Sequence, residues 1–206
     1  MTLLNLFAQS PILGMVFLIS IVAAVTVHEF AHAWTATQLG DDTPRLQGRV
    51  TLSPGAHLDL FGSIAFLLLG FGWGKPVEYN PMRLKRQTDE LVIALAGPAS
   101  NLLFALVLNS IIHFTPGSAF GQLLGIASSI NVLLAAFNVI PIPPLDGSSV
   151  VAYFWPEYRS LVGGQIGTVI LLLIIFMPIG GGNLLASIIS PLEAFFGSIT
   201  HLFGLL

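Results

Sequence analysis

The chain has 206 residues, of which 54% are hydrophobic and only 8% carry a charged side chain. An ordinary soluble domain has about a quarter of its residues charged. This composition therefore excludes an ordinary soluble domain and indicates a membrane protein. The chain has no cysteine, which excludes disulfides and thiolate metal ligands. Any metal site must therefore use His, Asp or Glu. Nothing in the sequence suggests nucleic-acid binding.

Six apolar segments follow one another along the chain, and several reach or approach the ~20 residues that a helix needs to cross a ~30 Å hydrocarbon core. They cover residues 11–39, 58–71, 89–114, 119–139, 163–178 and 183–206. The N-terminal stretch lacks the basic start and the small-residue cleavage site of a signal peptide, so we expect the first segment to be retained. We expect one membrane-embedded domain over residues 1–206, without an appended soluble domain.

The basic residues predict how these segments are oriented. All seven lie in two polar regions: Arg45, Arg49, Lys75, Arg83, Lys85 and Arg86 in the first, and Arg159 in the second. The connections "HFTPGSAF" and "MPIGGGN" carry none. By the positive-inside rule, the basic regions face the cytoplasm and the two bare connections face the other side.

The segment 58–71 is short and has basic residues on both sides. Its length of about 14 residues falls short of a comfortable crossing. We therefore favour a re-entrant hairpin, which gives five crossings, an outside N-terminus and a cytoplasmic C-terminus. The alternative is a short tilted span, which gives six crossings.

Two stretches beside this hairpin have strand-like alternation, namely "RLQGRVTLS" at 45–53 and "KPVEYN" at 75–80. We expect them to pair at the cytoplasmic surface, with an open edge to which an extended peptide can add. The expected fold class is an all-α polytopic membrane protein with five to six transmembrane helices, a re-entrant hairpin and a small β element at the cytoplasmic side.

Two histidines and a glutamate stand near the end of the first apolar segment. His28 and His32 are four residues apart, so on a helix they share one face and can bind one metal ion. Glu29 lies beside that face and can reach a metal-bound water as a general base, the H-E-x-x-H arrangement. The alternative is a chance spacing, in which the histidines bond to the backbone or to each other.

Two histidines do not complete a metal site, and Asp146 is the best candidate for the third ligand. The charge-based orientation brings His28 and Asp146 to the same depth, because His28 lies late in a helix that starts outside and Asp146 lies at the end of another such helix. Asp146 is also the only acidic residue between Glu90 and Glu157. The alternative is a turn-forming Asp before Gly147.

Several other polar residues have two open interpretations. Asn101 and Asn138 either donate to an oxyanion or a substrate backbone, or join helices through hydrogen bonds. His57 is an accessory metal ligand, a substrate-entry residue or, as we favour, a hydrogen-bonded anchor of the hairpin with Asp59 as its partner. Gly97 is expected to allow a helix or the hairpin to pack closely.

The motifs "HEFAH", "AGPASN" and "NVIPIPPLDG" together resemble the site-2 protease family of membrane-embedded zinc metalloproteases. The resemblance covers about residues 25–151 and is greatest to the short prokaryotic type without PDZ or regulatory domains. It implies that His28, His32 and Asp146 bind zinc and that Glu29 is the catalytic base. It also implies that Asn101 and Asn138 contribute to substrate handling.

The resulting expectation is a zinc-dependent intramembrane endopeptidase with one Zn²⁺ per chain. Its substrates are membrane proteins or membrane peptides, and it lies in the cell membrane with the active site near the cytoplasmic side. Its catalytic core covers about residues 11–151, and 163–206 form accessory transmembrane helices. The alternatives are a transporter or ion-binding protein that uses the same three ligands, and a non-catalytic scaffold with structural zinc.

Overall fold

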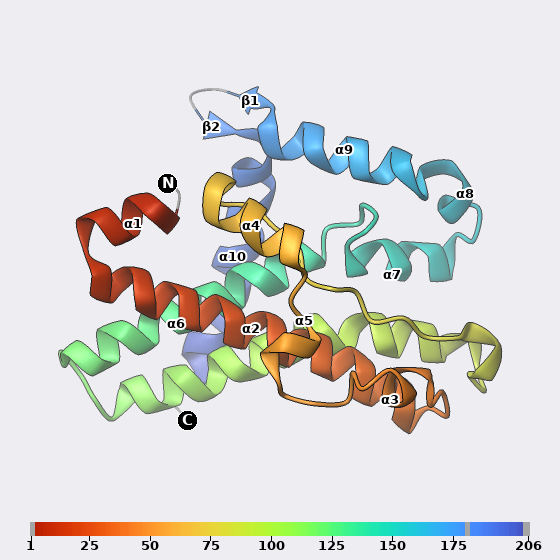
Figure 1. The fold of residues 1–206 in the computed structure, drawn as a ribbon, viewed down its shortest axis with the longest axis horizontal. Coiled ribbons are helices and arrows are strands. Elements are labelled where there is room, and N and C mark those ends of the chain that lie inside the picture. The colour runs from red at the N-terminus through yellow and green to blue at the C-terminus, as the bar shows by residue number, and fades with distance from the viewer. Residues whose placement is uncertain (1–2, 180–181, 204–206) are drawn as a thin grey trace.

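The computed structural model describes residues 3–179 and 182–203, which form a mainly helical chain (Figure 1). The α-helices are α1 (Leu3–Gln9), α2 (Pro11–Gln38), α3 (Thr43–Leu46), α4 (Leu60–Leu69), α5 (Gln87–His113), α6 (Ala119–Asn138), α7 (Asp146–Phe154), α8 (Tyr158–Val162), α9 (Gln165–Phe176) and α10 (Leu184–Phe203). Two 3₁₀ turns, η1 (Pro54–Ala56) and η2 (Pro81–Arg83), and two strands, β1 (Pro178–Ile179) and β2 (Gly182–Asn183), complete the described elements.

Helices α2, α5 and α6 form the centre of the molecule, and each packs against the other two. Figure 1 shows them side by side, with consecutive helices running in opposite directions. The end of α2, the start of α5 and the end of α6 therefore meet at one end of the bundle. Helix α10 packs on α5 and α6, and α7 packs on α5.

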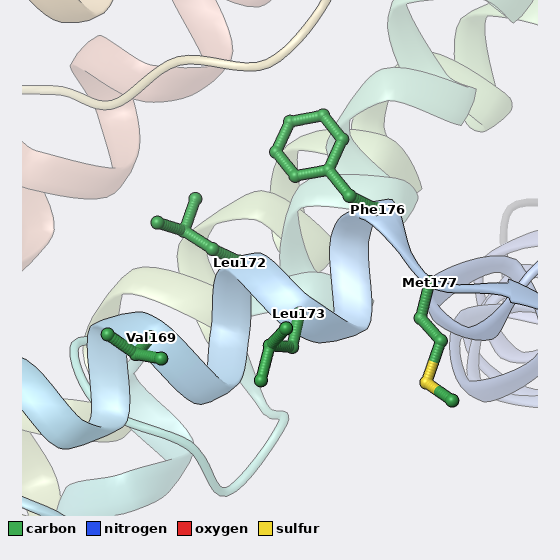
Figure 2. Close-up of a pocket in the computed structure, with 5 residues that line it drawn as sticks. All are labelled: Val169, Leu172, Leu173, Phe176 and Met177. Atoms are coloured by element: carbon green, nitrogen blue, oxygen red, sulfur yellow. The ribbon is translucent and has the colours of Figure 1, made fainter.

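Four of the described helices are long and apolar enough to cross a membrane, namely α2, α5, α6 and α10. All four coincide with predicted apolar segments, with α5 beginning two residues before its segment, and the last three residues of the segment 183–206 lie outside the described residues. Helices α4 and α9 are apolar but shorter. Figure 2 shows a shallow apolar pocket along α9, lined by exposed side chains of the kind that face lipid: Val169, Leu172, Leu173, Phe176 and Met177.

The segment around α4 returns to the place where it starts. Asp59 begins the helix, because its Oδ1 accepts a hydrogen bond of 2.7 Å from the Gly62 amide. Gly70 ends the helix in the left-handed conformation, with φ of 75°. The chain then runs back so that Leu58 pairs with Gly74 in an antiparallel bridge, and the Lys75 amide donates to the His57 carbonyl at 2.7 Å. This is the geometry of a hairpin.

The predicted strands at 45–53 and 75–80 are wrong. The first stretch begins within α3 and then bends at Gly48, whose φ is 68°, and neither stretch belongs to a strand. Side chains join the two stretches instead: Gln47 Nε2 donates to Glu78 Oε2 at 3.0 Å, and Arg49 Nη2 donates to the Lys75 carbonyl. Alternation was misleading here because the proline before Arg45 and the positive φ of Gly48 favour a turn over an extended chain.

The two-stranded sheet that the described residues do form lies elsewhere. Strands β1 and β2 are antiparallel, with Pro178 opposite Asn183, and join α9 to α10. Their connection is one of the two without basic residues, which the charge pattern assigns to the side opposite the cytoplasm. The position predicted for the β element is therefore not the observed one.

Candidate functional site

His28, His32 and Asp146 meet at one point of the bundle. The Nε2 atoms of the two histidines are 3.1 Å apart, and Asp146 Oδ2 lies 3.1 Å from His28 Nε2 and 3.3 Å from His32 Nε2. Both histidines are buried in α2, and Asp146 is the first residue of α7. The sequence-based expectation that α2 and the "PPLDG" turn arrive at the same level is therefore met.

Hydrogen bonds at the far side of each imidazole determine which nitrogen carries the proton. His32 Nδ1 lies 2.7 Å from the Ile93 carbonyl oxygen, which can only accept, so Nδ1 is the donor. His28 Nδ1 lies 2.7 Å from Asn101 Oδ1 and donates in the same way. In the neutral rings both Nε2 atoms are then unprotonated, and their lone pairs face Asp146.

The orientation of the Asn101 amide is itself determined by its neighbours. Its Nδ2 donates to the Ala24 carbonyl at 3.0 Å and to Asn131 Oδ1 at 2.9 Å, so Oδ1 is the atom left to face His28. Asn131 is held in turn, since its Nδ2 donates to the Ala127 carbonyl at 2.9 Å. Asn101 and Asn131 are fully buried. The structure thus places Asn101 behind His28, in the interhelical role that the sequence left open.

The three facing atoms fit a divalent metal ion. Two imidazole nitrogens and a carboxylate oxygen are all acceptors, and Asp146 Oδ2 is buried without a hydrogen-bond donor among the residues that the structure describes. A proton can bridge only two of them, whereas a metal ion satisfies all three. Zinc bonds of ~2.0–2.1 Å place tetrahedral ligands about 3.3–3.4 Å apart, close to the separations observed here. Three protein ligands also leave one coordination position open.

Gly97 on α5 provides the space for the two imidazoles. A Cβ atom at this position would lie 2.3 Å from His32 Nε2 and 2.6 Å from His28 Nε2. The sequence predicted that Gly97 lets a neighbouring helix or the hairpin approach closely, and the neighbour is α2, through its two metal-binding imidazoles. A glycine inside a helix beside Pro98 was the available signal.

Apolar packing holds the turn that carries Asp146. Ile140 and Leu145 flank the proline-rich turn and are buried in a cluster with side chains from α6, α9 and α10. Gly147 lets α7 begin close to the end of α6, because a Cβ there would lie 2.2 Å from the Val139 carbonyl oxygen. Asn138 is half-buried and donates to the Leu134 carbonyl at 2.9 Å, and it does not belong to the three-residue group.

Glu29 is adjacent to His28 in α2, and its side chain is 15% exposed. Its Oε2 is 3.7 Å from Arg49 Nη2, an ion-pair contact longer than a hydrogen bond. The hairpin passes close to it, since a Cβ at Gly74 would lie 3.6 Å from Glu29 Oε1. The Asp146 side chain is 21% exposed, so neither carboxylate is fully buried.

His57 anchors the hairpin region and lies outside the metal-binding group. It is fully buried, its Nε2 donates to the Thr51 carbonyl at 2.7 Å, and its own carbonyl accepts from Lys75. The anchoring interpretation therefore agrees with the geometry. The predicted partner is wrong, because Asp59 caps α4 instead of bonding to His57.

A bundle of apolar helices with a His, His, Asp group and a neighbouring glutamate defines the class of membrane zinc metalloproteases. The sequence places the chain within that class: it belongs to Peptidase family M50, the site-2 proteases, whose family model matches residues 16–122 and 116–179. The protein is accordingly a metalloendopeptidase.

Curated relatives carry names of the same kind. The chain is 34% identical to "Putative zinc metalloprotease YwhC" of Bacillus subtilis over 84% of this chain and 86% of that protein. It is 31% identical to "Putative zinc metalloprotease Rip2" of Mycobacterium tuberculosis over 76% of this chain and 64% of that protein. It is 40% identical to "Putative zinc metalloprotease MJ0611" of Methanocaldococcus jannaschii over 34% of this chain and 37% of that protein. No solved structure matches the chain.

Proposed function

We propose that this protein is a zinc-dependent intramembrane endopeptidase that hydrolyses peptide bonds in or near the transmembrane segments of other membrane proteins. The observation that carries the proposal is the meeting of three metal-binding atoms of His28, His32 and Asp146 beside Glu29, within a bundle of apolar helices. The family supports the hydrolytic chemistry, and the helices support a site close to the bilayer.

Each residue of the site has a distinct role in the proposal. His28, His32 and Asp146 hold the metal, and Asn101 and the Ile93 carbonyl orient the two imidazoles. Zinc supplies Lewis acidity, which polarises a scissile carbonyl and makes a water molecule acidic near neutral pH. Glu29 accepts the proton of that water and transfers it to the leaving amine.

The charge pattern supports a multi-pass protein of the cell membrane with the site near the cytoplasmic side. Basic residues cluster around the end of α2 and the start of α5, the end of the bundle that holds the metal group. The hairpin around α4, with its exposed apolar side chains, is proposed to dip into the bilayer from the same side. Its polar ends would then let water reach Glu29.

The extended stretch after the hairpin is the proposed docking place for substrate. Residues 76–79 make no hydrogen bond through their backbone within the described part of the chain, while the flanking Lys75 and Asn80 are both held. Such a stretch can pair with an extended peptide. A substrate helix hides its carbonyls in internal hydrogen bonds, so it must unwind locally before it can be cleaved.

The test compares wild type with Glu29→Gln, purified in detergent, for bound zinc and for cleavage of single-span membrane peptides. We expect both to contain one zinc per chain and only wild type to cleave, with a loss of at least about 10²-fold in the variant. Cleavage at equal rates would contradict the role of Glu29.

Two further outcomes would favour the alternatives. Zinc flux through proteoliposomes that survives Glu29→Gln, without any cleavage, would indicate a transporter. Loss of folding on zinc removal, again without any cleavage by wild type, would indicate a scaffold.

A further inference from the structure

Arg49 is a buried cation beside the proposed base. It lies in the loop after α3, and only 3% of its surface is exposed, which is rare for arginine. A buried guanidinium is costly unless a negative charge and hydrogen bonds compensate it. The carboxylate within ion-pair distance, among the described residues, is that of Glu29, with 3.7 Å between Nη2 and Oε2.

The same guanidinium connects three separate parts of the chain. Its Nη2 donates to the Lys75 carbonyl on the returning limb of the hairpin, while its Nε and Nη1 are buried and have no hydrogen-bond partner in the described part of the chain. Its backbone amide donates to the Pro44 carbonyl at 2.8 Å. Arg49 thereby places a positive charge next to Glu29 from outside α2, on a support formed by the α3 loop and the hairpin.

The distance to Glu29 has a chemical consequence. At 3.7 Å the two groups attract each other but do not form a hydrogen bond. The attraction restrains the carboxylate, yet its oxygens keep their lone pairs available to accept a proton. A direct two-pronged hydrogen bond would restrain Glu29 more firmly but would occupy the atoms that the reaction requires.

We propose that Arg49 is a positioning residue that holds the Glu29 carboxylate at the metal group through charge. This proposal rests on the proposed function, because only that function makes Glu29 a base. The pairing of Arg49 with Glu29 is a property of the folded protein. The competing explanation is purely structural: Arg49 only ties the loop to the hairpin through the Lys75 carbonyl.

The kinetic experiment uses Arg49→Met, which keeps an apolar stem without charge, and Arg49→Lys, which keeps the charge without the planar fork. The matched control is Arg45→Met, since Arg45 lies in α3 with a side chain that is 60% exposed. If Arg49 acts through charge, Arg49→Met lowers kcat by on the order of 10²-fold with little change in KM. Arg49→Lys then recovers most of kcat, and zinc affinity is unchanged in all three variants.

The proposal is overturned if Arg49→Lys is as inactive as Arg49→Met and both lose thermal stability equally, which is the result of a structural tie. It is also overturned if Arg49→Met retains the kcat of Arg45→Met.

A stability cycle tests the pairing without any cleavage. Glu29→Gln and Arg49→Met should each lower the melting temperature, because each leaves its partner's buried charge unpaired, and the double variant should regain part of the loss. Additive losses would contradict the pairing. Absence of cleavage by wild type, together with a non-additive cycle, would contradict the proposed function and leave the pairing supported.

Discussion

At the scale of single residues, the metal group depends on side chains that contribute no ligand atom. Asn101 orients His28, Asn131 orients Asn101, and Gly97 leaves room for both imidazoles. Such outer contacts matter because metal ligands bind well only in one ring orientation and one tautomer. Loss of these outer contacts should therefore lower the metal affinity before it affects other properties.

Gly97→Ala is expected to lower zinc affinity by at least about ten-fold, because the new methyl group would overlap the Nε2 atoms of His28 and His32. Competition with a chromophoric chelator measures this. Gly125→Ala is the matched control: Gly125 is also inside a helix, and a Cβ there meets no atom of the described residues within 4 Å. Equal zinc affinity in the two variants would show that a methyl group at position 97 does not disturb the metal-binding atoms.

Sequence reasoning identified the ligand candidates and singled out Asn101 and Gly97, but it did not predict that Asn101 bonds to His28 or that Gly97 faces the two imidazoles. His28, Glu29 and His32 share one helical turn, so their relation follows from local geometry. Arg49 was considered only as part of a charge pattern, because nothing local reveals that it becomes buried. Asn131 carried no signal at all, since an asparagine in an apolar helix has many possible partners.

At the scale of elements, Asp41 links the end of α2 to the stretch after the hairpin. It is fully buried, accepts from the Thr43 amide at 3.0 Å and the Thr43 hydroxyl at 2.6 Å, and accepts from the Asn80 amide at 2.5 Å. Burial alone would raise the pKa of this carboxyl, but the hydrogen bonds from Thr43 and Asn80 outweigh burial and lower it. The charged form is thus the one that the fold prefers.

A lowered pKa in the folded state means that Asp41 stabilises the protein above the ordinary carboxyl pKa of about 4. That contribution is lost as pH falls below about 4 and through the folded-state value. We expect Asp41→Asn to lower the melting temperature at pH 7. As the pH is lowered, the difference in melting temperature between the variant and wild type should shrink. A difference that stays constant down to pH 3 would contradict this linkage.

The elements also show where local patterns were insufficient. Apolar segments predicted α2, α5, α6 and α10 because a long apolar run in a membrane protein has few alternatives to a helix. Alternation predicted strands at 45–53 and 75–80, but short alternating stretches are weak signals, and hydrogen bonds of side chains joined these stretches instead. The short helices α7 and α8 were not predicted.

At the scale of the whole molecule, the metal group joins parts that are far apart in the chain. Helix α2 supplies two ligands, and the turn after α6 supplies the third, supported by a core that includes α9 and α10. The helices beyond residue 163 therefore contribute to holding Asp146 in place. A bound ion would stabilise this arrangement, because it binds the folded chain and not the dispersed ligands.

Zinc removal is expected to lower the melting temperature of the purified protein, and added zinc should restore it. An ion present at about 100 times its dissociation constant contributes ~2.7 kcal/mol to folding stability. Differential scanning fluorimetry in detergent, with and without a chelator, measures the change. Glu29→Gln should respond to zinc as wild type does, because Glu29 is not a ligand, whereas Asp146→Asn should respond less. No response in wild type would contradict a metal bound by this group.

The sequence by itself determined the apolar helices and the one-turn spacing of His28, Glu29 and His32, since both depend on residues close together in the chain. The sequence also predicted that Asp146 lies at the same depth in the membrane as the histidines, because the basic loops orient successive helices. Only the tertiary structure decided that Gly97 faces the imidazoles, that Asn101 and Asn131 orient His28, and that Arg49 lies beside Glu29. These contacts depend on how α5, α6 and the α3 loop approach α2, and side-chain packing across the bundle sets that approach.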